Sequence, residues 1–245
     1  MTTSGTASFN LDLNDIIEEA YERCGVEVRT GYEHRTARRS LNLLFADWAN
    51  RGINLWTIEQ GSLNLAQGVA TYSLPVDTVD LLEHVIRTGA GNSATQADLT
   101  ISRISVSTYA TIPNKLTQGR PIQVWVNRQS GATIPNTNPP PDTVVNSPQI
   151  NVWPTPDGSQ AYQFVYWRMR RIQDAGSGTS TQDIPFRFLT CLVSGLAYYL
   201  ALKIPEALNR LEPLKQMYDE AWDLAAGEDR EKAPDRLVPR RMYIS

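Results

Sequence analysis

Residues 13–25, LNDIIEEAYERCG, predict an amphipathic helix that buries one face. The apolar side chains recur at intervals of three and four residues, which is the spacing of one α-helical face. They are Leu13, Ile16, Ile17, Ala20 and Cys24. Asp12 or Asn10 can cap the first turn by accepting a hydrogen bond from a backbone N–H. Gly25 can end the helix, because glycine adopts left-handed backbone angles at little cost.

A second helix is predicted between Thr30 and Gly52. Thr30 stands three residues before Glu33, the capping-box spacing in which each side chain satisfies a backbone N–H of the other residue. The buried stripe expected here is Ala37, Leu41, Leu44, Phe45 and Trp48. The polar residues outside it predict a face that meets solvent or a partner; they are Arg35, Arg38, Arg39, Asn42 and Asp47.

The period changes to two between about residues 55 and 183. Short segments rich in β-branched and aromatic residues are separated by Gly, Pro, Asn or Asp, which predicts strands without intervening helices. These segments are 63–65, 71–74, 81–87, 99–104, 122–126, 150–153 and 162–167. The proline-rich stretch 134–142 predicts an exposed loop. The stretch 176–182 is rich in Gly, Ser and Thr and predicts a flexible segment where the chain leaves the β module.

Helical periodicity returns after this region. Asp183 is expected to cap a helix that is apolar almost all round and therefore buried. This helix runs through Phe188, Leu192, Leu196 and Tyr199. A last helix is expected from Pro205, and Pro213 should bend it or delay its start. Its apolar face would hold Leu208, Leu211, Leu214, Tyr218, Trp222 and Ala225.

The order of these elements predicts an α+β chain. Its N- and C-terminal helices would form a four-helix bundle, because each apolar face needs another to cover it. An antiparallel β-sandwich-like module is inserted between them, and an extended tail follows. The expected parts are an N-terminal arm with the first two bundle helices (1–54), the β module (55–183), the last two bundle helices (184–228) and a C-terminal docking tail (229–245).

The composition of the chain argues against nucleic-acid wrapping and against membrane association. The 245 residues include 23 Lys and Arg against 26 Asp and Glu, a net charge of −3, so no general basic field favours wrapping nucleic acid. The longest apolar stretch, 188–202, is too short to cross a bilayer, and residues 1–8 lack the features of a secretory signal. We therefore expect no membrane association. Cys24 and Cys191 lie in helical patterns and are expected to be buried reduced thiols rather than a disulfide.

The sequence offers no catalytic or metal-binding set. His34 and His84 have no second ligand at a metal-binding spacing, and no nucleophile motif accompanies them. The close acidic pairs, Glu18 with Glu19 and Asp229 with Glu231, are typical of surface charge. Asp77 and Asp80 are expected to make turn hydrogen bonds. We therefore predict a protein that is not an enzyme and needs no cofactor or metal.

The glycines and aromatic residues also favour structural roles. Residues 89–91 and 176–178 lack the lysine and following helix of a phosphate loop, so hairpin and linker roles are expected. Trp48, Tyr218 and Trp222 fall on apolar helical faces. Trp125, Trp153 and Trp167 stand in alternating strands, which leaves only Trp56 open to a sugar-binding interpretation.

The C-terminal tail has the composition of a docking segment. Residues 229–245 carry five basic and three acidic side chains, a balance of +2 against −5 for the rest of the chain. From residue 236 onward three arginines alternate with large apolar residues, which suits an extended segment that binds a groove in another protein. The predicted partner-binding residues are Arg236, Leu237, Val238, Arg240, Arg241, Met242 and Tyr243. The alternative is a disordered, solubilising end.

Three stretches of the sequence resemble the head-to-tail adaptors of tailed bacteriophages, the tail tubular protein A-like and related neck proteins. They are 13–25, the helix end LLFADWANRGINLW at 43–56, and GVATYSLP at 68–75. The resemblance implies a ring, commonly of twelve copies, beneath the portal. The ring would extend the DNA channel and give the tail nozzle its attachment platform.

The same resemblance implies where each contact is made. Residues 236–243 would dock on the portal, and double-stranded DNA would pass through the lumen without specific binding. The protein would be made in the host cytoplasm and reside in the virion neck. Two other functions stay open at this point: a carbohydrate- or receptor-binding tail module that uses the β region, and a peptidoglycan hydrolase.

Overall fold

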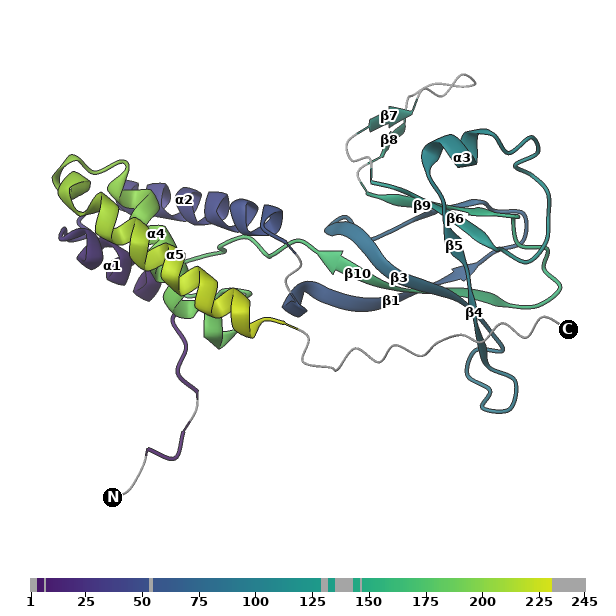
Figure 1. The fold of residues 1–245 in the computed structure, drawn as a ribbon, viewed down its shortest axis with the longest axis horizontal. Coiled ribbons are helices and arrows are strands. Elements are labelled where there is room, and N and C mark those ends of the chain that lie inside the picture. Colours follow the sequence, from purple (N-terminus) through teal and green to yellow (C-terminus); the bar gives the residue numbers. More distant parts are fainter. Residues whose placement is uncertain are drawn as a thin grey trace, which may run out of the picture. The chain divides into compact units, whose positions relative to one another are not determined.

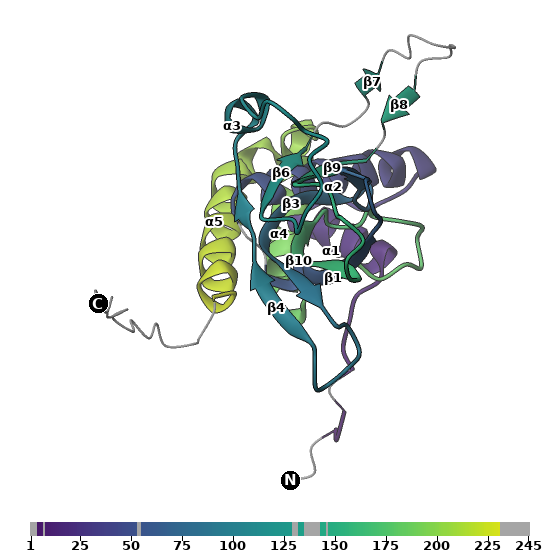
Figure 2. The same ribbon diagram turned by 90° about the vertical axis from the view of Figure 1, so that its right-hand side faces the viewer.

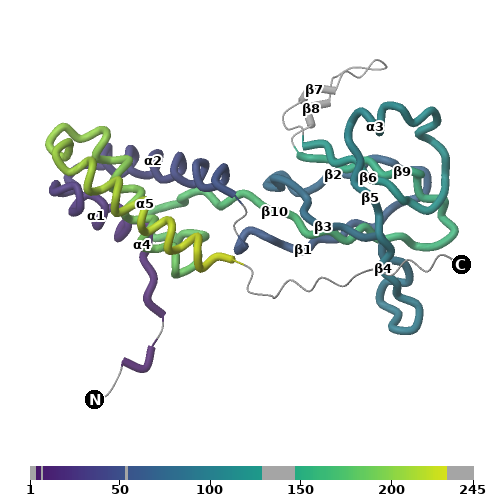
Figure 3. Tube along the Cα trace, in the orientation of Figure 1, coloured from purple at the N-terminus to yellow at the C-terminus, as the bar shows by residue number. Residues whose placement is uncertain are grey.

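A computed structural model describes residues 4–6, 8–52, 55–128, 132–134, 143–145 and 147–230 (Figure 1). The chain is α+β and divides into two compact units. The helical unit comprises the described residues of Met1–Arg51 and Gln173–Ser245, and the β unit comprises those of Gly52–Ile172. The chain trace in Figure 3 passes from the first two helices into the strands and then returns to the remaining helices.

Four long helices form the helical unit. They are α1 (Leu13–Cys24), α2 (Gly31–Asn50), α4 (Leu189–Ala201) and α5 (Leu211–Glu228). Helix α4 packs against the other three, and Figure 2 shows α5 on one side of it and α1 and α2 toward the other. Nearly every residue of α4 is buried, as its all-round apolar sequence predicts.

The predicted caps of the first two helices are confirmed. Asp12 caps α1 by accepting from the backbone N–H of Asp15 at 2.9 Å, and Gly25 follows the helix with φ 79°. Thr30 and Glu33 form the expected capping box at the start of α2. These contacts are local in sequence, so residue spacing alone predicts them.

Trp48 of α2 lies at the centre of the helical core and is fully buried. Its indole Nε1 donates a 2.9 Å hydrogen bond to the hydroxyl of Tyr218 on α5. The rings of Phe188 and Trp222 lie 5.5 and 5.4 Å from it, centroid to centroid. The guanidinium of Arg51 lies 4.7 Å from the ring centroid of Trp222, within cation–π range. This cluster joins α2 to α5.

The two cysteines are buried and unpaired, as predicted. The Sγ of Cys24 lies 3.3 Å from the carbonyl oxygen of Ala197 and donates to it. Burial raises the pKa of Cys24 to about 11 and that of Cys191 to about 12. Both thiols are therefore protonated at neutral pH and unreactive.

The start of α4 differs from the prediction. Asp183 does not cap it; its carboxylate accepts from the backbone N–H of Gln173 at 3.2 Å. A residue that precedes proline is disfavoured in the α conformation, so Pro185 prevents a helix that starts at Asp183. A 3₁₀ helix, η2 (Phe186–Phe188), comes first, and α4 begins at Leu189.

Pro213 delays the start of the last helix, which is one of the two predicted outcomes. Residues Pro205–Arg210 form a 3₁₀ helix, η3, and α5 begins at Leu211. Pro213 then lies in the first turn, where no backbone N–H is needed. Leu208 falls in η3 and is exposed, so its predicted place on the buried face is wrong.

The segment 176–182 is held against α1, and the prediction of a flexible segment is wrong. The carbonyl oxygens of Gly178 and Ser180 accept from the backbone N–H groups of Asn14 and Leu13, each at 3.1 Å. The guanidinium of Arg38 donates to the carbonyl oxygen of Gly176 at 3.1 Å. The first turn of a helix leaves its N–H groups unsatisfied, and this segment supplies their acceptors.

Two four-stranded sheets form most of the β unit. The first has the order β1-β10-β3-β4 and is antiparallel throughout. The second has the order β2-β9-β6-β5, in which only β5 and β6 are parallel. The strands of these sheets are β1 (Ile58–Leu65), β2 (Thr71–Ser73), β3 (Thr78–Thr88), β4 (Ala97–Thr100), β5 (Ser102–Arg103), β6 (Gln123–Asn127), β9 (Gln149–Trp153) and β10 (Tyr162–Arg170). A third, two-stranded sheet pairs β7 (Ala132–Ile134) with β8 (Thr143–Val145).

Side chains from both four-stranded sheets share one hydrophobic core. The predicted strand 99–104 is in fact two strands, β4 in the first sheet and β5 in the second, with buried Ile101 between them. A short helix, α3 (Val106–Ala110), follows where none was predicted, and Ser105 caps it. Of the predicted loop 134–142, residues 135–142 lie outside the described part of the chain.

Candidate interaction surfaces

The docking residues predicted in the tail lie outside the described part of the chain. They are Arg236, Leu237, Val238, Arg240, Arg241, Met242 and Tyr243. The structure describes the chain as far as Arg230, two residues after the end of α5. The site that sequence reasoning favoured therefore remains a prediction.

The point at which the tail leaves the helical unit is defined. Asp229 is buried and forms an ion pair with Arg187 of η2. Its backbone N–H donates to the carbonyl oxygen of Ala225 at 3.0 Å. Asp229 is therefore not the surface charge that its sequence context predicts. It fixes the C-terminal end of α5 to η2.

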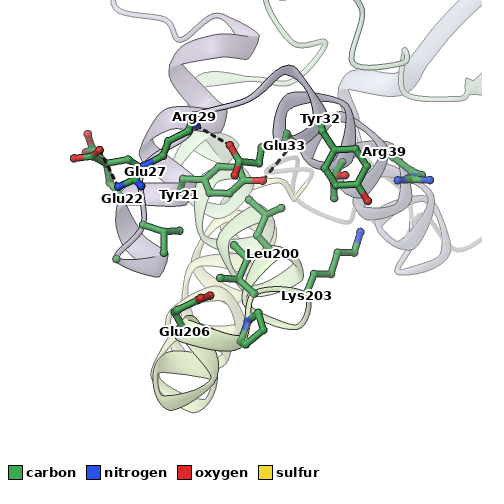
Figure 4. A pocket seen from close by; sticks show the side chains of 15 residues that line it. Tyr21, Glu22, Glu27, Arg29, Tyr32, Glu33, Arg39, Leu200, Lys203 and Glu206 are labelled. Atoms are coloured by element: carbon green, nitrogen blue, oxygen red, sulfur yellow. Dashed lines mark hydrogen bonds and ion pairs between the residues drawn. The ribbon is translucent and has the colours of Figure 1, made fainter.

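A groove of about 1200 Å³ opens on the helical unit (Figure 4). It lies between the end of α1, the first turns of α2, the end of α4 and the beginning of η3. Apolar and charged side chains alternate around it, including Tyr21, Tyr32, Arg39, Leu200, Lys203 and Glu206. Such a mixed lining is typical of protein contacts rather than of an enclosed reaction site.

Two ionisable groups of this groove, Glu33 and Tyr21, serve the local structure. The carboxylate of Glu33 accepts from the backbone N–H groups of Arg29 and Thr30 at 2.6 and 2.8 Å, which lowers its pKa. Tyr21 donates its hydroxyl to the carbonyl oxygen of Glu33 at 3.3 Å, and burial raises its pKa to about 12. Both pKa values move away from neutrality, which is the opposite of what a general acid or base requires.

His84 is half-buried beside the core of the β unit. It lies on β3 opposite Tyr166 of β10, and its ring stacks on Phe164 at 5.8 Å. Both ring nitrogens are buried without a hydrogen-bond partner, and burial lowers the pKa of the imidazole. Within the described ranges, no group of three His, Cys, Asp or Glu side chains is arranged to hold a metal.

The buried imidazole should make the stability of the protein depend on pH. The unfolded chain takes up a proton near the ordinary pKa of 6.5, whereas the folded chain resists it. The contribution of His84 to the free energy of unfolding should therefore be constant above about pH 6.5 and fall below it, by up to about 1.4 kcal/mol per pH unit. Replacement His84→Leu should remove the loss between pH 7.5 and 5.5, measured by urea unfolding. The control His34→Gln should retain it, and an unchanged loss in His84→Leu would contradict this role.

The carboxylates of the β unit are engaged by arginines across strands. Arg168 of β10 bonds Asp77 at 2.6 Å and Glu59 at 2.8 Å, and lowers the pKa of Asp77. Asp80 pairs with Arg103 at 2.8 Å. Asp80 also accepts a local hydrogen bond of the expected kind, from the backbone N–H of Leu81 at 2.8 Å, but the ion pairs of Asp77 and Asp80 were not predicted. A glycosidase needs a carboxyl whose pKa is raised, and this network does the reverse for Asp77.

The aromatic residues of the β unit make contacts within the protein. Trp125 stacks on Tyr109 of α3 at 5.1 Å, so one of its ring faces is covered. The Nε1 of Trp153 donates to the carbonyl oxygen of Asn114 at 3.1 Å. Trp56, which the sequence left open, is half-buried in a 3₁₀ helix, η1 (Leu55–Thr57).

Exposed apolar residues on two helices were missed from the sequence. Leu43 on α2 is 55% exposed, and Met217 and Leu224 on α5 are 48% and 77% exposed. A second apolar periodicity, offset from the buried stripe on each helix, is the signal that could have identified them. Exposed apolar side chains are significant only where they form a contiguous patch with their neighbours, as in a contact surface.

The described part of the chain contains no helix with the length and hydrophobicity needed to span a membrane.

No curated protein matches the sequence. The family model described as SU10 adaptor protein matches residues 10–240, which include most of both units. The chain belongs to this phage head-to-tail adaptor family.

Proposed function

We propose that this protein is a structural head-to-tail adaptor that forms a ring beneath the phage portal. The ring, of about twelve copies by resemblance to neck proteins, extends the DNA channel and provides the platform to which the tail nozzle attaches. The family match over residues 10–240 carries the proposal, because it extends across both units and into the tail. The protein belongs in this proposal to the virion neck, after synthesis in the host cytoplasm.

Each part of the fold has a place in this proposal. The helical unit acts as a four-helix bundle, and the β unit acts as a β-sandwich-like insertion that meets neighbouring subunits or tail proteins. Residues 236–243, which follow α5 in the sequence, dock on the portal. Their arginines and apolar side chains suit a groove with acidic and apolar walls.

The role proposed is not enzymatic. Arg168 holds the Asp77 and Glu59 carboxylates, and in the groove on the helical unit the pKa of Glu33 is lowered and that of Tyr21 is raised, both away from neutrality. The net charge of −3 also suits a DNA channel. Each lysine or arginine that neutralised a phosphate would hold the DNA back during its passage.

Complex formation with the portal tests this proposal. The purified chain, mixed with portal protein of the same phage, should co-elute with it in size-exclusion chromatography. The same chain should show no change of tryptophan fluorescence with glycans and no clearing of peptidoglycan in a zymogram. Failure to bind the portal, together with glycan protection or wall clearing, would replace the adaptor role by one of the two alternatives.

A further inference from the structure

Helix α2 carries an exposed stripe opposite its buried face. The α2 stripe consists of Tyr32, Arg35, Arg39, Leu43 and Ala46, all of which are exposed. Their spacing of three and four residues places them along one side of the helix. Neither Arg35 nor Arg39 forms an ion pair with any described residue. The stripe is thus basic and apolar, with its charges available to a partner.

Helix α5 carries a second stripe of the opposite charge. The α5 stripe consists of Pro213, Met217, Glu220 and Leu224, which are also exposed. The helix as a whole has five acidic residues and one basic residue. Glu220 accepts a hydrogen bond from Gln216 at 2.9 Å, and no described basic side chain pairs with it. This stripe is acidic and apolar.

The two stripes face away from each other. Trp48 of α2 and Trp222 of α5 meet with their ring centroids 5.4 Å apart, which defines the side on which the two helices approach. A helix turns about 100° per residue, so positions two or five residues apart lie on nearly opposite sides. Leu43 is five residues from Trp48, and Leu224 is two residues from Trp222. Figure 2 shows α5 and α2 toward different sides of the helical unit.

We infer that the α2 stripe of one copy binds the α5 stripe of the next copy. A basic, apolar surface on one side and an acidic, apolar surface on the opposite side complement each other in a head-to-tail contact. Pairing of two identical stripes would oppose like charges. A contact between two different surfaces generates a ring when its rotation closes. This inference rests on the ring of the proposed function and assigns the surfaces that build it.

Two variants test the inference, and each introduces into one stripe a charge that repels the other stripe. Leu43→Asp places an acid opposite the acidic α5 stripe, and Leu224→Arg places a base opposite the basic α2 stripe. Both side chains are exposed, so far-UV circular dichroism should show an unchanged fold. In mass photometry, with and without the portal, each variant alone should need at least about tenfold more protein to assemble than the wild type. The control Glu18→Arg, exposed on α1 and outside both stripes, should assemble normally.

An equal mixture of the two variants distinguishes this contact from general damage. The intact α5 stripe of the Leu43→Asp copy meets the intact α2 stripe of the Leu224→Arg copy, and the two altered stripes now carry opposite charges. The mixture should therefore recover assembly. Rings formed by each variant as readily as by the wild type, or a mixture that stays in single chains, would overturn the inference and leave the ring itself standing. A wild-type chain that never assembles would overturn both.

Discussion

Deletion of residues 231–245 is expected to abolish portal binding while the rest of the chain stays folded. The deleted segment holds all of the predicted docking residues, and the cut leaves the pair between Asp229 and Arg187 in place. The end of α5 therefore keeps its attachment to η2. An extended segment that orders on binding supplies most of its contacts as one unit, so the expected loss of affinity is at least about a hundredfold. Size-exclusion chromatography with the portal and circular dichroism of the free chain measure the two effects.

The charge contribution to this docking can be separated from the apolar one. Replacement of Arg240 and Arg241 by alanine should weaken portal binding more at low salt than at high salt, because exposed charges are screened. The same loss at every ionic strength would assign the affinity to the apolar side chains. Portal binding unchanged by the deletion would refute the docking role of the tail.

Replacement of Trp48 by alanine is expected to destabilise the helical unit by about 3–5 kcal/mol. The side chain is fully buried, and its loss leaves a cavity between α2, α5 and Phe188. It also leaves the buried hydroxyl of Tyr218 without its indole donor. The free energy of unfolding of a domain is only about 5–15 kcal/mol, so this change removes a large part of it.

The effect of Trp48→Ala should appear as a lower melting temperature in circular dichroism at 222 nm, where helices dominate the signal. Leu202→Ala is the control, because Leu202 is 53% exposed and its loss should change stability by no more than about 0.5 kcal/mol. Equal melting of Trp48→Ala and the wild type would show that this cluster does not hold the helices together.

Sequence reasoning succeeds here where the cause is local. The N-cap at Asp12, the capping box at Thr30, the glycine end at Gly25 and the delayed start at Pro213 depend on residues within one or two turns. The all-round apolar character of α4 likewise predicts its burial without any knowledge of its neighbours. The division into helical and strand regions follows from the change of periodicity.

The same reasoning fails where the cause lies far along the chain. Nothing near Gly178 or Ser180 indicates that their carbonyl oxygens meet the start of α1. The burial of Asp229 depends on Arg187, 42 residues earlier. Residues 99–104 read as one strand, because the passage of Ile101 from one sheet to the other leaves no local signal. The α2 face predicted to meet solvent or a partner already contains Arg35 and Arg39, whereas the exposed apolar residues Leu43, Met217 and Leu224 were missed.

The central claim is that this chain acts by assembly with copies of itself on a portal. The mass of the complex tests this claim most directly. Mass photometry of the full-length chain with portal rings should show one discrete species in which the added mass is a fixed whole-number multiple of a single chain. The number of copies per portal should be about twelve if the resemblance to neck proteins holds. Particles at the mass of the portal alone, beside free single chains, would contradict the account.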